Sequence, residues 1–162
     1  MRRPQVLVLA IAASTLALDA CNPFHREPVT EVSRDVNVNS RWRATLVTPA
    51  TLAGAVQMNG TATMQPSRNT TDTDFSVNIA NATPGGLHPW QVHRGQCGAD
   101  DGVLGSADAY RSIKVGDDGR GAATARVAMP TPASGSYFVT VKASAANAEV
   151  VVACGNLAPP AQ

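Results

Sequence analysis

Three histidines and three cysteines carry most of the chemistry available to this 162-residue chain. Imidazole and thiolate groups are the usual protein ligands of copper and zinc, and two thiols can instead form a disulfide. His88 and His93 lie five residues apart, and Cys97 follows them shortly afterwards. A site that needs four or more histidine ligands is excluded, because the chain has three.

Residues 1–20 have the layout of a secretory signal. Arg2 and Arg3 form a basic start, and an apolar run extends from Val6 to Leu18. That run is too short to span a bilayer comfortably as a mature helix. A buried N-terminal helix is the alternative interpretation. The sequence therefore predicts an exported protein with residues 1–20 as its signal peptide.

Cys21 directly follows the predicted signal. The stretch Leu18–Cys21 (LDAC) resembles the lipobox of bacterial lipoproteins, in which the cysteine is lipidated and becomes the mature N-terminus. Asp19 departs from that pattern, which usually has a small or apolar residue there. Ordinary cleavage after Ala20 is the alternative. The resemblance implies a bacterial cell-envelope protein anchored to the membrane through Cys21, with residues 21–40 as a lipidated cysteine and flexible tether.

Charge excludes two classes of partner. The chain has 13 basic and 12 acidic side chains, and removal of Arg2, Arg3 and Asp19 with the signal leaves 11 of each. A neutral chain lacks the basic stripe that nucleic-acid binding requires, and it also lacks a polybasic membrane patch. We therefore expect membrane contact through the lipid, no nucleic-acid partner, and an envelope protein as a candidate partner.

Residues 41–157 have the pattern of an all-β domain. Phe75, Val77 and Ile79 alternate with polar or small residues, and the turn residues of Thr83–Gly86 end this strand. Short strands separated by such turns predict a Greek-key β-sandwich or barrel of about eight strands. Residues 158–162 are expected to form a tail. The expected strands are Trp42–Val47, Ala53–Met64, Phe75–Ile79, Leu87–Arg94, Ile113–Val115, Ala123–Ala128, Tyr137–Val141 and Val150–Cys154, with turns at Asp100–Gly102 and Asp117–Gly119.

Cys97 and Cys154 are the two cysteines of this domain. In an exported protein such a pair most simply forms a disulfide, although two free thiolates holding a metal are the alternative. The bond would close a loop of about 58 residues and stabilise the fold by roughly 4 kcal/mol. We expect replacement of either cysteine to lower thermal stability strongly, and His93→Ala to change it little.

Two motifs of this domain resemble a known family. Gly86–His93 (GLHPWQVH) is similar to the copper-binding strand of Cu/Zn superoxide dismutases, whose pattern is Gly-x-His-Gly-Phe-His-Val-His. Val152–Leu157 (VACGNL) resembles the C-terminal Ala-Cys-Gly segment of that family, and Cys97 matches its other disulfide cysteine. The resemblance spans residues 41–157 and implies an eight-stranded Greek-key β-sandwich of the superoxide dismutase type.

The same comparison shows that metal ligands are missing. Gln91 stands where the family has its first copper histidine, His93 is retained, and Lys142 is the nearest match to the last copper histidine. Gly98–Ser112, where the bridging and zinc ligands are expected, contains no histidine. His88 matches a histidine that is a structural neighbour in the family, and we expect it to hydrogen-bond a backbone carbonyl.

These departures predict a degenerate metal site. Copper needs several nitrogen or sulfur donors, and a Lys142 ammonium repels a cation unless burial deprotonates it. The expected function is a non-catalytic, superoxide dismutase-like envelope lipoprotein with a binding or structural role and no cofactor. Copper and zinc are the cofactors if the family's function is retained.

Two alternative functions retain a copper site. One is a superoxide dismutase with an atypical copper site at His93, with His88 as a further candidate. The other is a weak copper-binding envelope protein that combines His93 with methionines (Met58, Met64 and Met129), for which core packing is the simpler interpretation. An odd separation places His88 and His93 on opposite faces of a regular strand, unless Pro89 introduces a bulge.

Overall fold

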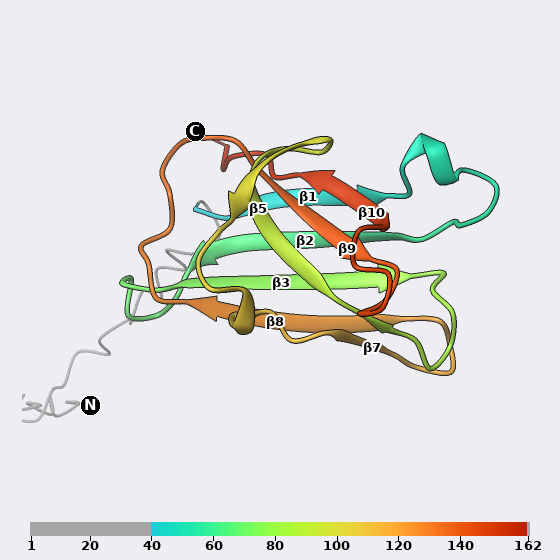
Figure 1. The fold of residues 1–162 in the computed structure, drawn as a ribbon. Helices are drawn as coiled ribbons and strands as arrows, with labels where there is room; N and C mark the ends of the chain where they lie inside the picture. The colour runs from blue at the N-terminus through green and yellow to red at the C-terminus, as the bar shows by residue number, and fades with distance from the viewer. Residues whose placement is uncertain (1–39, 162) are drawn as a thin grey trace, which may run out of the picture. The chain divides into compact units, whose positions relative to one another are not determined.

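The computed structural model describes residues 40–161. The predicted signal peptide (1–20), Cys21 and the tether as far as residue 39 lie outside the described residues. The described part is all-β and contains no α-helix (Figure 1). Within this part, no helix has the length and apolar character needed to cross a membrane.

Ten strands and two single-turn 3-10 helices make up the domain. In chain order they are β1 (Trp42–Val47), η1 (Ala50–Leu52), β2 (Asn59–Pro66), β3 (Thr73–Ala80), β4 (Leu87–His88), β5 (Trp90–Gln96), β6 (Ala99–Val103), η2 (Ala107–Ala109), β7 (Ile113–Val115), β8 (Gly121–Val127), β9 (Tyr137–Lys142) and β10 (Val151–Asn156).

All ten strands belong to one antiparallel sheet with the order β4-β7-β8-β3-β2-β1-β10-β9-β5-β6. Four connections join strands that are not neighbours in this order: β3 to β4, β4 to β5, β6 to β7 and β8 to β9. Only Pro89 separates β4 at one end of the order from β5 near the other. The backbone N–H of Lys142 on β9 donates to the carbonyl of Pro89 at 2.8 Å. The sheet therefore curls until its two ends meet at Pro89 (Figure 1).

The strand count differs from the expected eight at two places. Pro89, which has no N–H to donate, divides the expected Leu87–Arg94 strand into β4 and β5. The turn expected at Asp100–Gly102 is wrong, because these residues lie in β6. The chain reverses earlier, between the paired residues Gln96 and Ala99, where Gly98 has a φ of +91°. A glycine adopts this left-handed conformation without steric cost.

The strand expected over Ala53–Met64 is wrong in its first half. β2 begins at Asn59, and Ala50–Leu52 forms a 3-10 turn instead. Gly60 lies within β2, where a Cβ would come 2.1 Å from the carbonyl oxygen of Asn78 on β3. The glycine is therefore required by close strand packing rather than by a turn.

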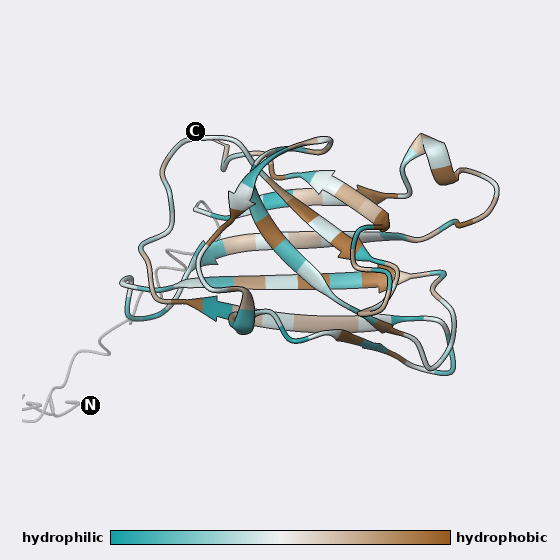
Figure 2. Cartoon of the chain, in the orientation of Figure 1, coloured by the Kyte–Doolittle hydropathy of each residue, from teal (hydrophilic) through white to brown (hydrophobic). Residues whose placement is uncertain are grey.

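Alternating side chains build the core in the way the period-two pattern predicts. Phe75, Val77 and Ile79 are all buried, and the two indoles, Trp42 and Trp90, are among the largest fully buried side chains. The Trp90 N–H donates to the carbonyl of Arg111 at 2.8 Å, so its burial leaves no polar atom unpaired. Brown and pale or teal segments alternate along the strands in Figure 2. One face of each strand points into the core, and we call the opposite face the outer face.

Candidate functional site

The two strands β5 and β9 carry the positions that the sequence resemblance compares with copper ligands. Trp90 and Val92 of β5 belong to the core cluster. Side chains alternate along a strand, so Gln91 and His93 lie on the outer face. Sequence reasoning placed a histidine and an amide at neighbouring ligand positions, and the strand presents both on the same side.

The partner strand completes this face. Val139 and Val141 of β9 are core residues, so Thr140 and Lys142 lie on the outer face. Gln91 is paired with Thr140 in the β5–β9 register. The three positions at which the resemblance places copper ligands therefore share the outer face of two adjacent strands.

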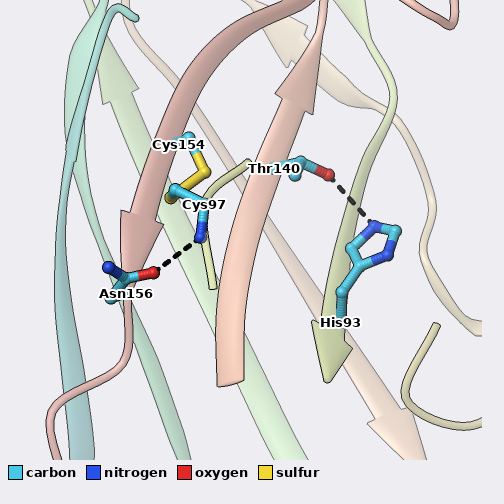
Figure 3. Close-up of a disulfide and its surroundings, with 5 residues drawn as sticks. All are labelled: His93, Cys97, Thr140, Cys154 and Asn156. Atoms are coloured by element: carbon cyan, nitrogen blue, oxygen red, sulfur yellow. Dashed lines mark hydrogen bonds between the residues drawn. A yellow bond between two sulfur atoms is a disulfide. The ribbon is translucent and has the colours of Figure 1, made fainter. Parts of the chain in front are cut away.

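Both nitrogens of the His93 ring have hydrogen-bond partners. The ring is buried and stacks on Phe138, with centroids 5.1 Å apart. Nδ1 lies 3.0 Å from the Asp100 Oδ1. Nε2 lies 3.2 Å from the Thr140 hydroxyl (Figure 3). A carboxylate can only accept, so Nδ1–H donates to Asp100, and the Nε2 lone pair accepts the hydroxyl proton of Thr140.

The electrostatics keep this ring neutral near neutral pH. Burial lowers the pKa of His93, and the nearby Lys142 adds to this effect, while Asp100 opposes it. The backbone N–H of Gly102 donates to the Asp100 carboxylate at 2.7 Å. That bond lowers the pKa of Asp100, and His93 lowers it further. The site therefore pairs a neutral imidazole with a carboxylate.

The donor set of the outer face does not fit copper. Gln91 offers an amide, Lys142 an ammonium, and His93 one lone pair that already accepts a hydrogen bond. In residues 40–161 there is no group of three or more His, Cys, Asp or Glu side chains that could hold a metal ion. Copper requires several nitrogen or sulfur donors around one point.

His88 is a structural residue. Its Nδ1 lies 3.0 Å from the backbone carbonyl of Lys142, as the sequence predicts. Its Nε2 is buried without a hydrogen-bond partner, and a Cβ on Gly86 would come 2.9 Å from it. His88 and His93 hydrogen-bond different groups, so the structure does not join them in a common site.

The methionines considered as Cu(I) ligands lie elsewhere. Met58 and Met64 are core residues, and Met129 packs against the core. His93 lies on the outer face of its strand, so the sheet separates it from the core methionines. The interpretation of Met58 and Met64 as core packing is confirmed.

A disulfide fastens the β5–β6 turn to β10. Cys97 and Cys154 are bonded, as the sequence predicts. The backbone N–H of Cys97 also donates to the Asn156 side-chain oxygen at 2.8 Å (Figure 3). Cys154 is paired with Thr140 in the β9–β10 register. The disulfide therefore lies close to Thr140, whose hydroxyl hydrogen-bonds His93.

A groove of about 880 Å³ lies beside these groups, over β1, β9 and β10. Its walls include the segment around η1 and the disulfide-bearing turn, and neither His88 nor His93 lines it. Val47, which is 56% exposed, and Leu52 contribute apolar surface. Lys142 and Glu149 contribute opposite charges.

Sequence reasoning missed the groove and both partners of His93. Asp100 follows His93 by seven residues, and the positive-φ turn at Gly98 brings it back alongside β5. Recognition of a hairpin centred on Gly98 could have revealed this contact. Thr140 lies 47 residues from His93, and only the β5–β9 register places them together.

No protein-family model matches the sequence, and no curated protein matches it either. Function must therefore be inferred from the side chains of the domain and from the motifs of the sequence.

Proposed function

We propose that the chain is a lipid-anchored protein of the bacterial cell envelope whose superoxide dismutase-like domain is a non-catalytic binding module. The observation that carries this proposal is the donor set of Gln91, His93 and Lys142. Only His93 supplies an imidazole, and its lone pair accepts a hydrogen bond from Thr140. Dismutation alternates the oxidation state of a metal, and this donor set cannot hold copper in both states.

The groove supports a binding role. Ligand pockets in proteins commonly enclose about 300–1,000 Å³ and combine apolar walls with a few polar groups. The groove has this size, with Val47 and Leu52 as apolar surface and the charges of Lys142 and Glu149.

Metal content tests the non-catalytic part of the proposal. The purified full chain is loaded with copper and zinc, dialysed, and assayed for bound metal and superoxide dismutation. We expect neither stoichiometric copper nor activity. One tightly bound copper per chain together with activity would refute the proposal.

A rebuilt site provides the matched control. The double substitution Gln91→His and Lys142→His places three imidazoles on the outer face of β5 and β9. We expect this variant to bind one Cu(II) and to show the visible absorption of a copper–imidazole complex. Failure of this variant to bind would mean that three imidazoles at these positions do not meet at one point.

The anchor is tested separately. Expression of the full chain in a bacterium should place it in the membrane fraction, with a mature N-terminus at Cys21 that carries lipid by mass spectrometry. Cys21→Ser should move the protein to the soluble fraction. A wild-type chain that is soluble and begins after Ala20 would show ordinary cleavage instead.

A further inference from the structure

One chain of hydrogen bonds links three strands beside the groove. It runs from Asp100 on β6 through His93 on β5 to Thr140 on β9. Each group acts in its natural role: the carboxylate accepts, the imidazole donates and accepts, and the hydroxyl donates. The ring lies between its two partners and stacks on Phe138, so its orientation is fixed.

The hairpin that carries Asp100 has little packing of its own. β6 is the last strand of the sheet order and pairs only with β5 among the described strands. Its residues Ala99 to Gly102 are all exposed. With so little apolar burial, the hairpin depends on specific links to stay against the domain. Three are present beyond its pairing with β5: the Cys97–Cys154 disulfide, the bond from the Cys97 N–H to the Asn156 side chain, and the Asp100–His93 bond.

We infer that His93 is a positioning residue, an imidazole protonated at Nδ1 that holds Asp100, and with it β6, beside Thr140 of β9. His93 thus links neighbouring strands through two hydrogen bonds, where a ligand histidine would link them through a metal. This inference rests on the proposed function, because the hairpin forms one wall of the groove.

The disulfide and the Asp100–His93 bond restrain the same short segment, because Cys97 and Asp100 are three positions apart. Removal of both should therefore have a larger effect on hairpin opening than the sum of the two single effects. Neighbouring groups that restrain the same segment are expected to show such non-additivity.

The tautomer of His93 gives a direct spectroscopic test. In ¹⁵N-detected NMR of the full chain, we expect the His93 proton on Nδ1 and an unprotonated Nε2. Addition of copper or zinc should leave these signals unshifted. A proton on Nε2 would overturn the inference, because the Nδ1 lone pair could not donate to Asp100.

Hydrogen exchange tests the link to the hairpin. Asp100→Ala removes the acceptor at an exposed position, so the protein should fold. We expect amide exchange at residues 99–103 to accelerate about tenfold, with exchange in β2 and β3 unchanged. The adjacent carboxylate provides the matched control: Asp101→Ala should leave exchange in the hairpin nearly unchanged. Equal acceleration in both variants would overturn the inference.

Substitutions of His93 distinguish the effect of its hydrogen bonds from the effect of its bulk. His93→Phe keeps an aromatic ring for stacking but has no nitrogen, and it should accelerate hairpin exchange as Asp100→Ala does. His93→Gln retains one donor and one acceptor and should restore part of the protection. Exchange in the Phe variant that stays as slow as in the unsubstituted protein would show a purely steric role and would overturn the inference. Tightly bound copper with activity would refute the proposed function but would leave the exchange result to decide the role of His93.

Discussion

The disulfide between Cys97 and Cys154 should be the largest single contribution to the stability of this domain that one chemical change can remove. The decisive perturbation is the double substitution Cys97→Ala and Cys154→Ala, with chemical reduction of the unsubstituted protein as a second route. Both are made in a Cys21→Ser background, so that no third thiol can exchange with the pair.

The magnitude follows from the length of chain that the bond closes. The two cysteines are 57 positions apart. In the chain-entropy treatment, a loop of this length restricts the unfolded state by about 4 kcal/mol at 25 °C. Domains of this size are usually stable by only about 5–15 kcal/mol. Loss of the bond should therefore remove a quarter or more of the folding free energy.

Urea unfolding of the full chain measures this difference. With a urea dependence of about 1.5 kcal/mol per molar, a loss of about 4 kcal/mol lowers the midpoint by about 3 M. The reduced protein and the double alanine variant should agree closely, because both release the same loop. The slope of the transition should stay nearly constant if the native fold is kept.

Two results would refute this reasoning. A midpoint shift below about 0.7 M would correspond to about 1 kcal/mol, which is too little for a loop of this length. A large shift in the alanine variant without one on reduction would assign the effect to packing around Cys154, which is buried, rather than to the cross-link.

Three further predictions concern stability. Gly60→Ala should destabilise the domain by about 2 kcal/mol in urea unfolding, because its Cβ would come 2.1 Å from the backbone oxygen of Asn78. His93→Ala should cost about 2 kcal/mol, more than the sequence alone suggests, because it leaves a cavity and unpairs a buried hydroxyl. The free energy of unfolding should also decrease as the pH is lowered. The folded state holds the pKa of His93 below its ordinary value of 6.5, so the unfolded chain takes up the proton first. This loss begins as pH falls through 6.5, is complete below the folded pKa, and should be absent from His93→Phe in urea titrations at several pH values. The lowered pKa of Asp100 adds a second loss as pH falls below about 3.8.

Local chemistry explains which parts of the fold could be predicted. Phe75, Val77 and Ile79 alternate without interruption, and all three are buried in β3. The hairpin at Asp117–Gly119 is also correct, because Gly119 supplies the positive φ and Asp118 accepts the N–H of Arg120. Both features depend on residues close together in the chain, where side-chain type largely decides the backbone conformation.

The missed elements depend on competition between local preferences. The run from Ala53 to Met64 is rich in small and apolar residues, which suit a strand, a turn or a buried coil equally well. The turn residues of Asp100–Gly102 form β6 because the preceding Gly98 already reverses the chain, and the ladder with β5 then continues through them. Tertiary pairing overrides turn preference at that point.

Strand register brings the residues of the candidate site to one face of the sheet. Gln91 and His93 share a face because they are two residues apart, and β9 brings Lys142 to the same side through its pairing with β5. This convergence belongs to the backbone and holds for any side chains at those positions. The side chains then determine what the face can bind. The Lys142 ammonium repels a cation and the Gln91 amide attracts it little, while Asp100 and Thr140 hydrogen-bond both nitrogens of the His93 ring. The face that the resemblance assigns to copper therefore presents here a set of hydrogen bonds, and function must be assigned from those bonds rather than from the fold.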